Sequence, residues 1–317
     1  MNAGNSVKIA KLIKQHLLFC LLVLASYFLS HEVHSAEKQV RIMSWGRDSS
    51  EKSEIGVNEI RMGCASGPEL CAKSIDARNL SGVDEVALSL GYQKEDNFLE
   101  KDLPGYLKLV ADHPKVKEIG MDDFASFMGR LWSGTAAQKM LDFIQAMKKS
   151  SAIRFRVTVY DDELAKISMN EKLFPLQLRK KVDSVAFYLR YRDNVNQYDY
   201  LLRQVTSLFP NAKIYGGVYH YDRIDYIFCD ENKRERCTKE QEMELFSLTL
   251  KKQLQLVGDK RLAGLEFYPG FIGEESTWGA WKKNAICRQN RIEDCVKNSQ
   301  LMGAILRDEV LRFSAQR

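Results

Sequence analysis

The chain is poor in histidine and proline, and no charge of one sign dominates it. Its 317 residues include 5 histidines and 6 prolines, and 47 Lys and Arg stand against 42 Asp and Glu. No proline-rich linker, low-complexity tract or short repeat interrupts the sequence. Because phosphate contacts need clustered basic side chains, this dispersed charge disfavours a nucleic-acid partner.

Several catalytic motifs are also absent. The sequence has no Gly-x-Ser-x-Gly elbow, no phosphate-binding loop and no paired-histidine zinc motif. Only His113 and His220 lie beyond residue 36, which leaves little material for histidine-dependent chemistry. We therefore expect no metal and no cofactor, and carboxylates are the remaining groups for acid and base chemistry.

The first 35 residues have the three parts of a secretory signal peptide. A segment with three lysines and no acid comes first, the apolar run Leu17–Leu29 follows, and Val33 and Ser35 supply small residues for cleavage. The apolar run is shorter than the ~20 residues that span a bilayer. We expect cleavage after Ser35 or Ala36 and no stable membrane span afterwards; an uncleaved anchor is the alternative.

Six cysteines follow the predicted signal peptide, and they fall into three close pairs. The pairs are Cys64 with Cys71, Cys229 with Cys237, and Cys287 with Cys295. An even number of cysteines in an exported chain predicts disulfides, and we expect each cysteine to bond its neighbour. Zinc is the alternative, but no pair has the two-residue spacing of a zinc knuckle. The predicted location is periplasmic or secreted.

Residues 36–317 predict a single α/β domain, in which apolar runs of strand length alternate with amphipathic segments. The runs, apolar on both faces as buried parallel strands are, are Val40–Trp45, Val83–Leu90, Val116–Met121, Ile153–Tyr160, Val182–Leu189, Ala212–Tyr221 and Leu262–Tyr268, with an eighth possible at Gly56–Met62. Segments such as Ala136–Lys149, Tyr198–Phe209 and Glu240–Val257 carry apolar residues at helical spacing.

Seven strand and helix units, together with the possible eighth strand, predict a (β/α)8 TIM-type barrel whose first unit can be irregular. The length agrees, since such barrels take ~250 residues. An open doubly wound sheet is the alternative. Its usual glycine-rich phosphate turn is missing, because Gly46-Arg47-Asp48-Ser49 follows the first predicted strand.

Acidic and aromatic residues gather at the carboxyl ends of the predicted strands, where barrels of this kind carry their active sites. These acids include Asp122, Asp123, Asp222 and Glu266. Two carboxylates facing each other across an aromatic cleft can hydrolyse a glycosidic bond, one as general acid and the other as nucleophile or base. The predicted substrate contacts are Trp45, Tyr160, Tyr188, Arg190, Tyr219, His220, Tyr221 and Tyr268.

Each of these acids also has a structural interpretation. The run Asp161-Asp162-Glu163 fits a helix cap better than a site. Of Asp122 and Asp123, one can brace the loop while the other faces the cavity. Asp222 can pair with a neighbouring arginine, and Glu266, inside an apolar strand, must reach a polar mouth or meet a base such as Arg190.

Three stretches carry a resemblance to a known group of proteins. His113-Pro114-Lys115-Val116 leads into Met121-Asp122-Asp123-Phe124, Val182-Asp183-Ser184-Val185 follows, and Gly216-Gly217-Val218-Tyr219-His220-Tyr221-Asp222 comes last. The chain resembles exported bacterial barrel proteins of glycoside-hydrolase-like type over its middle and C-terminal two thirds. The resemblance implies a carbohydrate-related barrel with Asp122, Asp123 and Asp222 as site positions.

The leading hypothesis is an exported glycoside-hydrolase-like barrel that acts on a polysaccharide or glycoconjugate through paired carboxylates. The second is a carbohydrate-binding barrel without catalysis, in which the same aromatic residues stack on sugars. A third is a lyase or a hydrolase dependent on a divalent cation, with Asp122, Asp123 and Glu266 as oxygen ligands. Turnover separates the first two hypotheses, and chelation tests the third.

Overall fold

The computed structural model describes residues 40–45, 55–64, 66–90, 98–131, 135–219, 228–230, 237–268 and 292–316. Residues 1–39, His220, Tyr221, Asp222 and Cys287 lie outside these ranges, as does the side chain of Cys295. Within the described ranges, no helix combines the length and the apolar character that a bilayer crossing requires.

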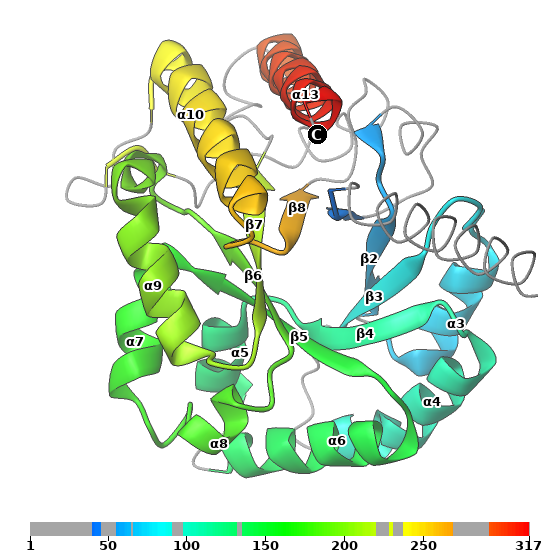
Figure 1. Ribbon diagram of the computed structural model, residues 1–317. Helices are drawn as coiled ribbons and strands as arrows, with labels where there is room; N and C mark the ends of the chain where they lie inside the picture. Colours follow the sequence, from blue (N-terminus) through cyan, green and yellow to red (C-terminus); the bar gives the residue numbers. More distant parts are fainter. Residues whose placement is uncertain are drawn as a thin grey trace, which may run out of the picture. The chain divides into compact units, whose positions relative to one another are not determined.

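Eight parallel strands form a closed barrel in the order of the sequence (Figure 1). They are β1 (Ile42–Trp45), β2 (Glu59–Cys64), β3 (Glu85–Leu90), β4 (Val116–Met121), β5 (Arg154–Tyr160), β6 (Ser184–Tyr188), β7 (Lys213–Tyr219) and β8 (Gly264–Tyr268). The barrel closes where β1 pairs with β8, with Met43 opposite Glu266. Seven predicted runs contain a strand, and the eighth, Gly56–Met62, overlaps β2, which extends to Cys64, so the predicted (β/α)8 fold is confirmed.

Helices surround the strands and share an apolar core with them. They are α3 (Pro68–Asp76), α4 (Phe98–Asp112), α5 (Phe124–Leu131), α6 (Ala136–Ser150), α7 (Leu164–Met169), α8 (Leu176–Arg179), α9 (Tyr198–Leu208), α10 (Lys239–Gly258) and α13 (Ile292–Ala315), with short 3-10 turns η1 (Asp161–Glu163) and η2 (Arg192–Gln197). Aromatic contacts join neighbouring helices, as where Tyr106 of α4 meets Phe143 of α6 edge to face at 6.3 Å.

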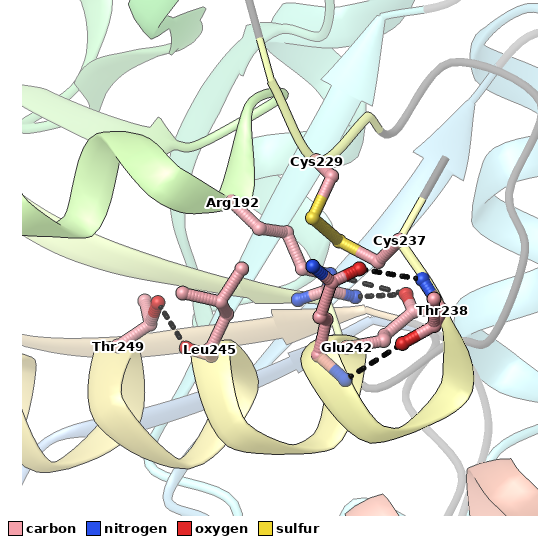
Figure 2. Close-up of a disulfide and its surroundings, with 8 residues drawn as sticks. Arg192, Cys229, Cys237, Thr238, Glu242, Leu245 and Thr249 are labelled. Carbon is pink, nitrogen blue, oxygen red and sulfur yellow. Dashed lines mark hydrogen bonds and ion pairs between the residues drawn. A yellow bond between two sulfur atoms is a disulfide. The ribbon is translucent and has the colours of Figure 1, made fainter. Parts of the chain in front are cut away.

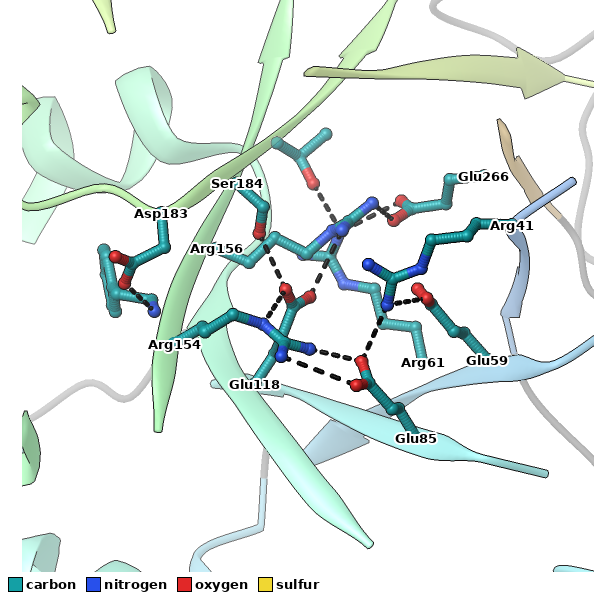
Figure 3. Close-up of polar contacts among 12 residues, drawn as sticks. Arg41, Glu59, Arg61, Glu85, Glu118, Arg154, Arg156, Asp183, Ser184 and Glu266 are labelled. Carbon is teal, nitrogen blue, oxygen red and sulfur yellow. Dashed lines mark hydrogen bonds and ion pairs between the residues drawn. The ribbon is translucent and has the colours of Figure 1, made fainter. Parts of the chain in front are cut away.

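The interior of the barrel is charged, and the prediction of strands apolar on both faces is wrong there. Arg61 of β2 and Arg156 of β5 each donate to Glu266 of β8, although neither strand is a neighbour of β8 (Figure 3). Each of the three is at most 1 % exposed. Because each charge has a partner of opposite sign, the interior accepts them without the cost of an isolated buried ion.

Two disulfides are formed as predicted. Cys64 at the end of β2 bonds Cys71 of α3, and Cys229 bonds Cys237, the residue before the N-cap of α10 (Figure 2). That cap is a capping box: the Thr238 side chain accepts from the Gln241 N–H at 3.3 Å, and the Gln241 side chain accepts from the Thr238 N–H at 3.0 Å.

Candidate functional site

A cavity of about 350 Å³ lies at the carboxyl ends of the strands. Its lining combines five aromatic residues with two acids, two hydroxyls and one base, namely Trp45, Asp122, Asp123, Ser126, Thr158, Tyr160, Tyr188, Arg190, Tyr219 and Tyr268. The aromatic residues are the last of their strands β1, β5, β6, β7 and β8. Eight of the residues predicted from the sequence therefore meet at one mouth, where (β/α)8 proteins carry their sites.

Asp122 and Asp123 reach the cavity through a tight turn between β4 and α5. Asp123 has φ 46°, a left-handed conformation that aspartate adopts more readily than most residues. Its carbonyl then accepts from the Phe127 N–H at 2.8 Å and begins α5. Both carboxyl groups line the cavity, so neither of them is reserved for capping.

Asp122 has the pKa of an acid that exchanges protons near neutrality. Removal from bulk water raises the pKa of Asp122 to about 6, and the charges of Asp123 and Glu266 add to this effect. The Arg61 guanidinium and a hydrogen bond from Thr158 act in the opposite direction. The side chain is open to the cavity yet poorly hydrated, which is the usual setting of a perturbed catalytic carboxyl group.

Glu266 lies beneath the cavity and does not line it. Its Oε1 accepts from Trp45 Nε1 at 2.9 Å and from Tyr188 Oη at 3.0 Å, while Oε2 accepts from Arg156 at 2.5 Å. Burial acts to raise the pKa of Glu266, but Arg156 and Arg61 outweigh it and hold the pKa at about 2. Glu266 is therefore an ionised anchor for two rings of the cavity wall.

Arg61 links this anchor to the cavity, and the sequence interpretation missed it. Its Nη1 donates to Glu266 at 2.9 Å and to Thr158 Oγ1 at 2.8 Å, and the Thr158 hydroxyl bonds Asp122. The guanidinium also lies over the Trp45 ring, 4.4 Å from its centroid. A charged residue inside a predicted buried strand was the signal that could have identified it.

Arg190 is the only basic side chain among the described residues of the cavity wall. It donates to both oxygens of Asp162, at 3.1 and 3.2 Å, and it lies over the Tyr160 ring at 3.8 Å. It is farther from Asp123, at 3.9 Å. The expected alternative pairing of Glu266 with Arg190 is wrong, because Arg61 and Arg156 occupy Glu266 from inside the barrel.

Asp161, the first acid after β5, braces a neighbouring loop, so the helix cap predicted for it is wrong. Asp161 accepts from the backbone N–H groups of Arg190 and Tyr191, at 2.8 and 3.2 Å, and from Asn194 at 2.8 Å. It thereby holds the segment after β6 that carries Arg190, rather than capping its own helix. Burial raises the pKa of Asp161 to about 6, and these hydrogen bonds oppose the shift.

The disulfide between Cys229 and Cys237 supports the same segment from the other side. The Phe228 N–H donates to the Arg190 carbonyl at 2.8 Å, and the Arg192 N–H donates to Phe228 at 2.9 Å. The Arg192 side chain in turn pairs with Glu242 of α10 at 2.9 Å, beside the disulfide (Figure 2). The segment that carries Arg190 is thus connected to the first turns of α10, through Phe228 and through the ion pair of Arg192 with Glu242.

The rings of the cavity wall pack on one another. Tyr188 and Tyr219 lie 4.6 Å apart between centroids, and Trp45 meets Tyr268 edge to face at 5.8 Å. Gly217 makes room for this wall, since a Cβ there would lie 2.3 Å from the Tyr188 ring. Burial raises the pKa of Tyr188 well above its usual value, so its hydroxyl stays protonated and donates to Glu266.

Three of the predicted site residues, His220, Tyr221 and Asp222, lie outside the described residues. Among the residues that are described, no group of three or more His, Cys, Asp and Glu side chains could hold a metal ion. Of the three oxygen ligands proposed for a divalent cation, Glu266 already accepts from four side chains.

The comparisons with known proteins concern the fold. No family model matches the chain, and no curated protein matches its sequence. A GH113 beta-1,4-mannanase superposes with a TM-score of 0.52 at 9% identity, over 88% of this chain and 99% of that one. A complex structure of GH113 beta-1,4-mannanase superposes with a TM-score of 0.52 at 9% identity, over 88% of this chain and 98% of that one. An endo-1,4-beta-xylanase from Caldicellulosiruptor owensensis superposes with a TM-score of 0.48 at 8% identity, over 77% of this chain and 88% of that one. At such identities the mannanase superposition shows a shared barrel fold.

Proposed function

We propose that this protein is a glycoside hydrolase whose site is the cavity at the carboxyl ends of the strands. The observation that carries the proposal is Asp122, a carboxyl group with a pKa of about 6 on a cavity lined by five aromatic residues. A general acid or base works best when its pKa lies near the operating pH. The fold shared with a mannanase is compatible with this chemistry and does not prove it.

In this proposal Asp122 protonates the departing glycosidic oxygen and later accepts a proton from the attacking water. The second carboxylate is Asp123, which lines the same cavity, or Asp222. It bonds to the anomeric carbon as the glycosidic bond breaks, and water displaces it in the second step. Thr158 orients Asp122, because its hydroxyl accepts from Arg61 and bonds the Asp122 carboxyl group. Glu266 contributes by its fixed charge, which opposes ionisation of Asp122 and keeps that acid protonated at higher pH.

The aromatic wall supplies the binding surface. Sugar rings present apolar C–H faces, and these stack on aromatic rings that are rigidly held. Trp45 and Tyr188 are rigid here because each donates a hydrogen bond to Glu266, at 2.9 and 3.0 Å. A sugar bound against Trp45, the ring of the two that is partly exposed, would lie next to Asp122.

The test measures hydrolysis of a panel of cell-wall polysaccharides and exopolysaccharides by the wild type and by Asp122→Asn, Asp123→Asn and Asp222→Asn. Asn keeps the shape of Asp but cannot exchange a proton. General acid–base catalysis contributes about 10²–10⁴-fold, so Asp122→Asn should lose at least about that much activity. Asp112→Asn is the matched control, since Asp112 is an exposed acid of α4 paired with Lys108.

Two results would contradict the proposal. If Asp122→Asn keeps the wild-type rate on a substrate that the protein cleaves, Asp122 is not the proton donor. If activity falls only in proportion to a lowered melting temperature, the loss is structural. Melting curves for each variant separate these cases.

A second candidate function is a carbohydrate-binding barrel without catalysis. It is favoured by one observation, the saturation of Glu266, which leaves Asp122 and Asp123 as the described acids facing the cavity. These two are adjacent in sequence and follow the same strand. Binding of a glycan by the wild type with no turnover on any member of the panel would establish this function instead.

We also propose that the protein is exported, with residues 1–35 removed as a signal peptide and residues 36–317 acting in the periplasm or outside the cell. The two disulfides support an oxidising compartment. N-terminal sequencing of the exported protein should begin at Ala36 or Glu37. An intact Met1 on membrane-bound material would identify an anchor.

A further inference from the structure

Below the cavity, the barrel interior holds equal numbers of acidic and basic side chains. Four acids face four bases in one network of ion pairs (Figure 3). The acids are Glu59, Glu85, Glu118 and Glu266, and the bases are Arg41, Arg61, Arg154 and Arg156. Of its bases, Arg61 reaches the cavity wall, through Thr158 and the face of Trp45, and its charge lowers the pKa of Asp122 without bringing it to the usual value.

In the described part of the cavity wall the acidic side chains, Asp122 and Asp123, outnumber the single base, Arg190. Arg190 makes its short contacts to Asp162, a residue outside the lining. Arg190 also pairs with Asp123, at the longer distance of 3.9 Å, and the pKa of Asp122 stays raised although Arg61 lowers it. Two neighbouring carboxylates in a poorly hydrated cavity repel each other, and a bound cation relieves that repulsion.

The aromatic wall favours a cation as well. Two of its rings already hold guanidinium groups against their faces, at 4.4 Å for Arg61 over Trp45 and 3.8 Å for Arg190 over Tyr160. Tyr188, Tyr219 and Tyr268 line the same cavity as the two carboxylates. Aromatic rings with acids beside them are the usual recognition chemistry for ammonium groups.

We propose that the substrate is a glycoside of an amino sugar with a free ammonium group, which is bound between Asp123 and the aromatic wall. The inference rests on the proposed function and names the substrate class of that site. An N-acetylated or neutral sugar of the same ring shape would stack on the rings but would add no positive charge beside the two carboxylates. An acidic sugar would meet repulsion.

The first experiment is calorimetric titration of the exported protein with glucosamine, N-acetylglucosamine and glucose, which share a ring and differ in one group. Glucosamine is expected to bind at least about tenfold more tightly than the other two, as a partly desolvated cation–π and charge contact would give. Its binding should weaken with added salt. The binding of glucose should not respond to salt.

The second experiment compares hydrolysis of β-1,4- and β-1,6-linked glucosamine oligomers with that of their N-acetylated forms at equal length. The expected result is faster cleavage of the amino forms. Asp123→Asn is expected to lose most of the preference in both experiments, because the amide carries no charge. The control Asp112→Asn removes an equal charge outside the cavity and should retain the preference.

The outcomes distinguish this inference from the proposed function. Equal or tighter binding of the neutral sugars, or a preference that survives Asp123→Asn, overturns the inference. The proposed function stands in that case if a neutral oligomer is cleaved and Asp122→Asn abolishes its cleavage. Absence of both binding and cleavage with every sugar overturns the inference and, together with an inactive polysaccharide panel, the proposed function.

Discussion

The interior of this barrel holds two sets of charged side chains that are both screened from bulk water and differ in their partners. In the lower set Glu266 meets two arginines, and its pKa is held at about 2. In the upper set Asp122 lacks such a partner, and burial raises its pKa to about 6. Ion pairing therefore fixes the fully buried Glu266 as a structural ion, whereas Asp122, partly exposed on the cavity wall, is prepared for proton exchange.

The largest expected effect is on the lower set. Arg156→Met removes the cation between Glu118 and Glu266 and leaves each acid with one base. Breaking a buried ion pair costs about 3–5 kcal/mol, so we expect a loss of that size in the free energy of unfolding from urea titration. The control Arg312→Met removes an exposed arginine and should cost under about 1 kcal/mol. Similar values for both variants would show that the network contributes little.

Removal of either disulfide should lower the free energy of unfolding by the same amount, but the two removals should differ in their effect on the cavity. They close loops of similar size, with sequence separations of 7 and 8, so each double Cys→Ser variant should lose about 2–3 kcal/mol. Only loss of Cys229–Cys237 should weaken glycan binding, because residues 228–230 pair with the segment that carries Arg190. Equal binding losses in titrations of the two variants would contradict that assignment.

Substitutions at two glycines test the aromatic wall of the cavity, which lies between the two sets of charges. Gly217→Ala would drive a Cβ into the Tyr188 ring, whereas a Cβ at Gly63 of β2 meets nothing within 4 Å. Overpacking costs about 1–3 kcal/mol, and displacement of Tyr188 would also disrupt its hydrogen bond to Glu266. We expect Gly217→Ala to lower both melting temperature and glycan affinity, and Gly63→Ala to change neither. A normal affinity in Gly217→Ala would exclude the wall from binding.

The smallest effect on stability is expected at Asp122, where the substitution should raise the free energy of unfolding and not lower it. Because the pKa of Asp122 is raised on folding, its ionisation costs stability as pH rises through about 6. Asp122→Asn removes that cost and should gain about 1–2 kcal/mol near pH 8, with little gain near pH 4. Chemical denaturation at both pH values checks this. A loss of stability near pH 8 would mean that Asp122 serves the fold.

Much of the site could be predicted because strand ends can be recognised locally. A buried run that stops at Trp45, Tyr160 or Tyr268 puts its last residue at the barrel mouth in any (β/α)8 fold. The role of Glu266 could not be predicted in this way. Its position in an apolar strand required a base, but the sequence interpretation considered Arg190, a neighbour of the same rim, and the partners came from β2 and β5 instead.

The sequence by itself determined the eight strands, the two close disulfides of the described part and the gathering of acids and aromatic residues at one end. These follow from patterns within a few residues, since periodicity, turns and short loops are local properties. The tertiary structure alone decided which carboxyl group stays ionised and which is free to exchange a proton. Glu266 and Arg61 are 205 residues apart in sequence. Closure of the barrel brings them within 2.9 Å, and it leaves Asp122 without an equivalent partner.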